Sequence, residues 1–146
     1  MDIVDILLEV LERGASDLHL GAGDPPIVRV NGVLAPLEYS RLTAADTREL
    51  VYSILSQDQR QHLENEWEID FSYAVPGQAR FRVNAFFQRN SLSAAFRLIP
   101  VEIPRLDELG LPHVLHEFAS KPRGFVVVTG PTGSGKSTTL AAMIDE

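Results

Sequence analysis

The chain has 146 residues, of which 45% are hydrophobic and 23% are charged, and its formal net charge is −7. This composition is typical of a globular protein and excludes disorder over most of the chain. Net acidity argues against a protein that binds nucleic acid through the phosphate backbone. The chain has no cysteine, which excludes disulfides and thiolate metal sites, and no apolar stretch approaches the ~20 residues that cross a bilayer. We therefore expect no nucleic-acid partner and no direct membrane insertion.

The first hundred residues predict a mixture of helices and strands. Helical spacing of apolar residues, alternation, and an Asn31-Gly32 turn between two apolar runs are the main signals. In chain order, the predicted elements are a helix at 3–11 capped by Asp2, strands at 16–20, 27–30 and 33–34, helices starting near Thr43 and Ser56, and strands at 69–75, 79–87 and 92–99. This order indicates an α+β domain over residues 1–99.

The pattern changes after residue 99. Residues 100–104 contain two prolines, which exclude a regular helix and predict a linker. Beyond the linker we expect a helix at 106–118 broken near Pro112, a buried strand at 125–129, a glycine loop and a final helix. Residues 105–146 are therefore predicted to be the beginning of an α/β domain.

The glycine loop carries the strongest motif in the chain. Residues 130–137 match the phosphate-loop pattern G-x-x-x-x-G-K-[ST] in full. In such a loop Lys136 can bridge phosphate oxygens, Ser137 can be a ligand of Mg²⁺, and the following helix directs its positive end at the anion. We predict that ATP and Mg²⁺ bind here, at Gly130, Pro131, Thr132, Gly133, Ser134, Gly135, Lys136, Ser137 and Thr138.

Hydrolysis needs more than this loop. A phosphate-loop enzyme requires an acidic residue at a second strand end and a group that orients water. The sequence ends at Glu146, one helix after the loop. We therefore expect a fragment of a longer protein that does not hydrolyse ATP by itself, and we assign no catalytic residue.

A second charged feature lies in residues 71–100, which hold four arginines and no acidic residue. Pairing 79–99 as a hairpin with Phe81 opposite Leu98 makes one face wholly apolar, and a slip by one residue breaks this agreement. The same register sets Arg82 opposite Arg97, and like charges in that position destabilise a sheet unless an anion or a carboxylate lies near them. Three interpretations are open: an anion bound from a second domain, an ion pair with Asp70, and a solvated face.

Other candidate sites are weaker. Asp17 and His19 share one strand face, but two ligands are too few for a metal site, and we expect a solvated face. Phenylalanines at 81, 86, 87 and 96 could suggest a sheet that stacks RNA bases. Three of them lie on the apolar face of the hairpin, so we interpret them as core residues.

Several segments together resemble the secretion ATPases of type II/IV pilus systems. The matching segments are 14–20 (Gly-Ala-Ser-Asp-Leu-His-Leu), 25–32, 79–86, 95–100, 122–124 (Pro-Arg-Gly), the phosphate loop and 137–144. The resemblance covers essentially the whole chain. The chain starts almost directly on the Ser-Asp-Leu-His strand and continues Gly-Ala-Gly-Asp-Pro-Pro, which is similar to the retraction subgroup of the family.

The resemblance implies a PAS-like N-terminal domain, a linker, and a RecA-like P-loop ATPase domain cut after the Walker A helix. It further implies a homo-hexameric motor that powers pilus retraction and twitching motility from the cytoplasmic face of the inner membrane. Its partner there would be the platform protein of the pilus base. In the family, arginines of the N-terminal domain reach the bound ATP, and the matching positions are Arg82 and Arg97. Two alternatives remain: a related pilus or type II secretion ATPase, and a non-catalytic nucleotide-binding or assembly fragment.

Overall fold

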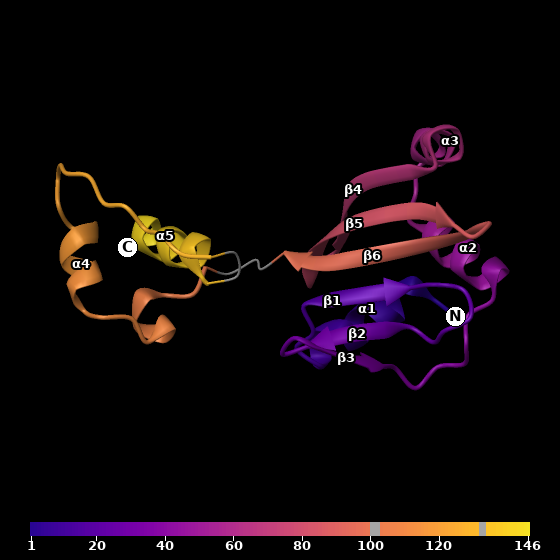
Figure 1. The fold of residues 1–146 in the computed structure, drawn as a ribbon, viewed down its shortest axis with the longest axis horizontal. Helices are drawn as coiled ribbons and strands as arrows, with labels where there is room; N and C mark the ends of the chain where they lie inside the picture. The colour runs from indigo at the N-terminus through magenta and orange to yellow at the C-terminus, as the bar shows by residue number, and fades with distance from the viewer. Residues whose placement is uncertain (100–102, 132–133) are drawn as a thin grey trace. The chain divides into compact units, whose positions relative to one another are not determined.

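The chain divides into two units, residues 1–99 and residues 100–146 (Figure 1). The structure, a computed structural model, describes residues 1–99, 103–131 and 134–146. Of the predicted linker, residues 100–102 lie outside the described residues. Ile103 and Pro104 belong to no helix or strand.

The first unit is built on one antiparallel sheet of six strands in the order β3-β2-β1-β6-β5-β4. The pairs β2–β3, β4–β5 and β5–β6 are hairpins between consecutive strands. The pairing of β1 with β6 joins segments from opposite ends of the unit at the centre of the sheet. The strands are β1 (Asp17–Leu20), β2 (Ile27–Val30), β3 (Val33–Pro36), β4 (Glu68–Val75), β5 (Ala79–Gln88) and β6 (Ser91–Ile99).

The three helices of this unit begin at the capping residues predicted for them. They are α1 (Ile3–Glu12), α2 (Ala44–Ser53) and α3 (Gln57–Glu66). The Asp2 carboxylate accepts a 2.9 Å hydrogen bond from the backbone of Val4. Thr43 and Ser56 each form a capping box with the residue three positions later. These side chains satisfy backbone N–H groups that have no partner inside a helix.

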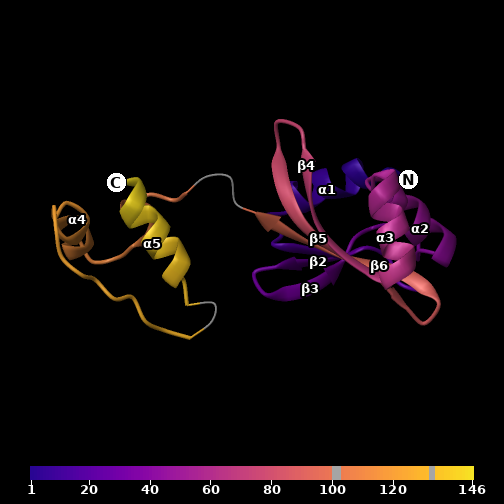
Figure 2. The ribbon, with the colours of Figure 1, turned by 90° about the horizontal axis from the view of Figure 1, so that it is seen from above.

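One face of the sheet forms the core, with α1 and α2 packed against it (Figure 2). Phe81 and Phe96 are fully buried, and their rings meet edge to face at 6.5 Å. Leu18 of β1, Ile6 of α1 and Val51 of α2 complete this layer at 0% exposure. The interpretation of Phe81 and Phe96 as core residues, and not as a base-stacking surface, is therefore confirmed.

The predicted register of the β5–β6 hairpin is also confirmed. Phe81 lies opposite Leu98, and Arg82 lies opposite Arg97. The loop is shorter than the predicted 88–91, because Gln88 pairs with Ser91. Only Arg89 and Asn90 remain in the turn, and both have positive φ, at 49° and 60°. Positive φ at both central residues is the geometry of the two-residue turns that match the twist of a hairpin.

The second unit contains short helices and a long irregular segment. Its elements are the 3₁₀ helix η1 (Leu106–Leu109) and the α-helices α4 (Val114–Ala119) and α5 (Lys136–Asp145). The break expected near Pro112 separates η1 from α4. The strand expected at 125–129 is wrong: these residues form neither helix nor strand, and Phe125 is 90% exposed. A strand requires a hydrogen-bonded neighbour, and no other segment among the described residues of this unit is a strand.

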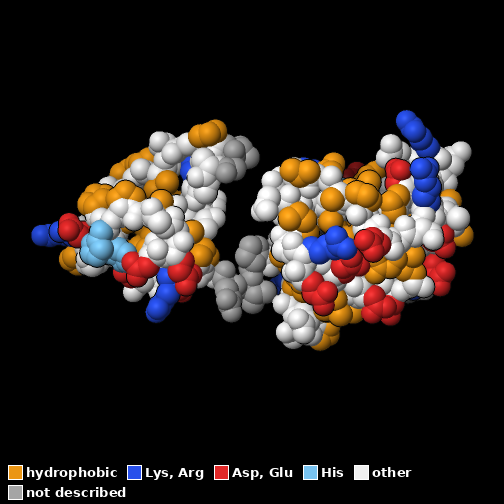
Figure 3. Space-filling model, turned by 90° about the horizontal axis from the view of Figure 1, so that it is seen from below, with side chains coloured by type: hydrophobic (Ala, Val, Ile, Leu, Met, Phe, Trp, Pro, Cys, Tyr) orange, Lys and Arg blue, Asp and Glu red, His pale blue; other side chains and the backbone are white. Residues whose placement is uncertain are grey.

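His116 connects three segments of the second unit. Its Nε2 lies 3.1 Å from Asp107 Oδ1, and its Nδ1 hydrogen-bonds to Glu146. In Figure 3 the histidine side chains of this unit lie next to acidic side chains. The hydrogen bond to Glu146, together with the charges of both carboxylates, raises the pKa of His116. The protonated ring therefore ties η1 and α4 to the end of α5.

This cluster predicts that the second unit is more stable at pH 6 than at pH 8. The pKa of His116 is higher in the folded protein than its ordinary value of 6.5 in the unfolded chain. The stability gained from protonation is therefore fully present below pH 6.5 and is lost as the pH rises through the pKa of the folded state. Urea unfolding followed by methyl NMR of α4 and α5 measures the effect. His116→Gln should remove the pH difference. His113→Gln is the control, since the His113 ring stacks on His116 at 4.8 Å but has no carboxylate partner among the described residues; an equal loss in both variants would contradict the assignment.

Candidate functional site

The phosphate-loop motif leads directly into α5. Gly135 caps the helix with a left-handed φ of 87°, and Lys136 is the first helical residue. The structure describes Gly130, Pro131 and 134–138 of the predicted site, whereas Thr132 and Gly133 lie outside the described residues. The motif therefore runs into the N-terminus of a ten-residue helix, where unpaired N–H groups favour an anion.

Gly130 is required by the shape of the loop. Its φ is 156°, and a Cβ placed on it would lie 2.6 Å from the Ser134 hydroxyl oxygen. That hydroxyl donates a 2.8 Å hydrogen bond to the Pro131 carbonyl and so fixes the turn. A side chain at position 130 would displace Ser134 from this bond.

Lys136 folds back over the loop. Its ammonium donates a 2.6 Å hydrogen bond to the Pro131 carbonyl. An ammonium group has three donors, so two remain for an anion held by the loop. Ser137 and Thr138 follow in the first turn of α5, and both are exposed. The arrangement presents a cation, two hydroxyls and a helix N-terminus within a few residues of sequence.

The two opposing arginines lie on the sheet face that the helices leave uncovered. Each has one carboxylate partner: Arg82 Nη2 lies 3.5 Å from Asp70 Oδ2, and Arg97 Nε lies 3.0 Å from Asp17 Oδ1. The Asp70 ion pair considered from the sequence is therefore present, but for Arg82 alone. The guanidinium side chains are 69% and 76% exposed.

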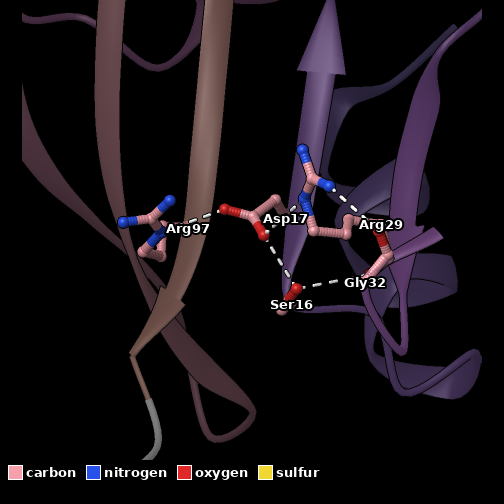
Figure 4. A network of polar contacts seen from close by, with 5 residues as sticks. All are labelled: Ser16, Asp17, Arg29, Gly32 and Arg97. Carbon is pink, nitrogen blue, oxygen red and sulfur yellow. Dashed lines mark hydrogen bonds and ion pairs between the residues drawn. The ribbon is translucent and has the colours of Figure 1, made fainter. Parts of the chain in front are cut away.

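Asp17 is not the solvated residue that its strand position suggested. Its side chain is only 11% exposed, and it lies between two arginines (Figure 4). Ser16 Oγ donates a 2.7 Å hydrogen bond to Asp17 Oδ2, and Arg29 Nε lies 3.5 Å from the same oxygen. Burial by itself raises the pKa of Asp17, but the bonds from Ser16 and Arg97 and the charges of Arg97 and Arg29 lower it overall. The carboxylate is thus held in its charged form.

A hollow of about 410 Å³ opens on this face of the sheet. Three carboxylates and two guanidiniums line it, together with His19, whose Nε2 is buried without a hydrogen-bond partner among the described residues. An anion would therefore bind at the exposed ends of the guanidiniums rather than deep between the acidic groups. The lining residues are Asp17, His19, Glu68, Asp70, Arg82, Asn84, Ala95, Phe96 and Arg97.

The described residues contain neither a membrane-crossing helix nor a preformed metal cluster. No helix within 1–99, 103–131 and 134–146 is both long and apolar enough to span a bilayer. The same residues place no three His, Cys, Asp or Glu side chains so that they could hold a metal ion.

Comparison with known proteins finds relatives among the ATPases of type IV pili. A relative in Pseudomonas aeruginosa, the type IV pilus retraction ATPase PilT, is 49% identical over 145 residues, which are 99% of this chain and 42% of the relative. The type IV pilus ATPase PilU of the same organism is 42% identical over 99% of this chain and 38% of the relative. A crystal structure of the pilus retraction motor PilT with bound ADP matches with a TM-score of 0.84 and 50% identity, covering 99% of this chain and 43% of that one.

The chain thus spans about two fifths of the length of these relatives. The family model described as type II/IV secretion system protein matches residues 1–146, the full length of the sequence. The expected family resemblance is confirmed, and the chain belongs to the type II/IV secretion system protein family.

Proposed function

We propose that residues 130–138 bind ATP and that the protein acts as a motor ATPase powering type IV pilus retraction. The observation that carries the proposal is the complete phosphate-loop motif, with Lys136 folded over the loop at the start of α5. The 49% identity to a relative that is a pilus retraction ATPase supports the motor assignment. The bound ADP in a similar solved structure supports a nucleotide as the ligand.

In this proposal, different residues of the loop bind different parts of the Mg·ATP complex. Backbone N–H groups of the glycine-rich turn would contact the phosphates, and Lys136 would give its two remaining donors to phosphate oxygens. The exposed Ser137 hydroxyl suits Mg²⁺, which takes few protein ligands and completes its shell with phosphate oxygens and water. Bound Mg²⁺ would neutralise the charge on the phosphates.

Arg82 and Arg97 add a second set of contacts in this proposal. Their exposed guanidiniums would bind the terminal phosphate of ATP held on the loop. Arginine suits this role, since its fixed fork of N–H donors matches a phosphate. Such contacts require exposed guanidiniums, a condition that Arg82 and Arg97 meet.

The remaining parts of the proposal concern the longer architecture. The first unit is a PAS-like domain, and the second begins a RecA-like domain. The assembled protein is a homo-hexamer on the cytoplasmic face of the inner membrane, at the platform protein of the pilus base. Hydrolysis would use an acidic residue at the end of a second strand and a group that orients water.

A chimera tests the function. Residues 1–146 are joined to the remaining length of the P. aeruginosa PilT relative and expressed in cells that lack that protein. We expect the chimera to hydrolyse ATP and to restore twitching, and the same chimera with Lys136→Ala to do neither. A chimera that binds and hydrolyses ATP but restores no twitching would contradict the retraction assignment. A chimera that binds ATP without hydrolysing it would favour a non-catalytic nucleotide-binding role.

A further inference from the structure

We propose that Asp17 is the positioning residue of Arg97: it holds the guanidinium through Nε, so that the two terminal nitrogens are presented to a phosphate. The proposal rests on the proposed function, in which Arg97 contacts the nucleotide. It assigns the role of the buried carboxylate at the centre of the network in Figure 4.

The position of Asp17 in the sheet makes it a link between strands. Its Cα is paired with Arg29 of β2 on one side and with Arg97 of β6 on the other. Oδ1 accepts the 3.0 Å bond from Arg97 Nε, and Oδ2 accepts the 2.7 Å bond from Ser16. Arg29 in turn donates a 3.1 Å bond to the Gly32 carbonyl. The carboxylate is thus held on both oxygens and tied to the β2–β3 turn.

Burial makes this carboxylate a fixed point. The Asp17 side chain is 11% exposed, whereas that of Arg97 is 76% exposed. A buried carboxylate is stable only while its oxygens are hydrogen-bonded, so its position is determined by its partners. Of the five N–H donors of a guanidinium, only the one on Nε is used by Asp17. The four on the terminal nitrogens make no hydrogen bond among the described residues.

The opposing arginine has no comparable anchor. The partner of Arg82 is Asp70, at 3.5 Å, and the Asp70 side chain is 54% exposed. A pair between two exposed side chains is weak and easily exchanged for water. For the two arginines that face each other across β5 and β6, we therefore expect Arg97 to be the more ordered and Arg82 the more mobile.

This difference gives opposite expectations for two matched variants. Asp17→Asn and Asp70→Asn each remove one negative charge from the same sheet face. If these carboxylates acted only through their charge, both variants would bind a triphosphate more tightly, because repulsion falls. If Asp17 positions Arg97, Asp17→Asn binds more weakly, since the guanidinium must be ordered during binding.

The experiment measures the order of the Arg97 side chain and the affinity for Mg·ATP, both on the full chain. ¹⁵N relaxation of the Arg97 Nε–H should show an ordered group that becomes as mobile as that of Arg82 in Asp17→Asn and stays ordered in Asp70→Asn. The affinity for Mg·ATP should fall by about tenfold in Asp17→Asn and should hold or rise in Asp70→Asn. Ser16→Ala removes the bond to Asp17 Oδ2 and should shift both measurements in the same direction as Asp17→Asn, but by less. It replaces Asp17→Asn if that variant does not fold.

An Arg97 Nε–H that stays ordered in Asp17→Asn, or an unchanged affinity, would overturn the positioning role. A different result would contradict the proposed function. If Lys136→Ala bound Mg·ATP as tightly as the wild type does, the loop would not be the nucleotide site. The relaxation of Arg97 would still decide, without nucleotide, whether Asp17 orders it.

Discussion

Replacing Lys136 by alanine is expected to weaken Mg·ATP binding by about a hundredfold or more. Each charge-assisted hydrogen bond to phosphate contributes about 1.5–3 kcal/mol, and this side chain can make two of them. The fold of the loop should survive. The substitution removes the bond from Lys136 to the Pro131 carbonyl, but the bond from the Ser134 hydroxyl to the same carbonyl remains and closes the turn. Titration of the chain with a fluorescent ATP analogue measures the loss.

The chain offers a matched control, because its other lysine lies in the same unit. Lys121→Ala removes the same charge outside the motif. We expect that variant to bind ATP as the wild type does. Equal weakening by the two substitutions would show a general effect of net charge, and no weakening by Lys136→Ala would reject the loop as the nucleotide site.

The features predicted well from sequence are those set by neighbouring residues. The β5–β6 register follows from alternation within a single hairpin, where one face must be apolar. The starts of α2 and α3 follow from capping side chains that act three residues away. In each case the determining contacts lie within a short stretch of chain.

The environment of Asp17 depends on a contact that no local pattern reveals. Asp17 and Arg97 are 80 residues apart, and they meet only because β1 pairs with β6. Within a single strand, a polar residue that alternates with buried leucines is predicted to face solvent. The sequence offered one signal: arginines occur on three other strands of an otherwise acidic unit, and a buried acidic residue would balance their charge.

The expected strand at 125–129 fails for a related reason. Its apolar, β-branched sequence predicts burial on both faces, yet Phe125 and Val127 are 90% and 64% exposed. Sequence preference describes the side chains that a sheet would cover, whereas strand geometry needs a hydrogen-bonded neighbour. No other strand is found in the second unit within residues 103–131 and 134–146.

Neutralising Arg82 and Arg97 together is expected to abolish discrimination between ATP and ADP. In the proposed function these arginines contact the terminal phosphate, which ADP lacks. Arg82→Gln/Arg97→Gln should therefore lose about tenfold or more in ATP affinity per arginine and little in ADP affinity. Arg80→Gln/Arg89→Gln is the control, as it removes two arginines from the same acid-free stretch. Calorimetric titration with both nucleotides measures the four affinities.

The same arginines would couple nucleotide state to movement. A ligand shifts the balance between two arrangements of the units only through its different affinity for each. Contacts from Arg82 and Arg97 to the terminal phosphate would favour an arrangement in which both units hold ATP, and hydrolysis would remove that preference. Because the chain has no cysteine, Gln61→Cys and Glu117→Cys, both at exposed positions, allow one spin label in each unit. We expect a non-hydrolysable ATP analogue to narrow the distance distribution and the arginine double variant to cancel that change. A shift that persists in the double variant would place the coupling elsewhere.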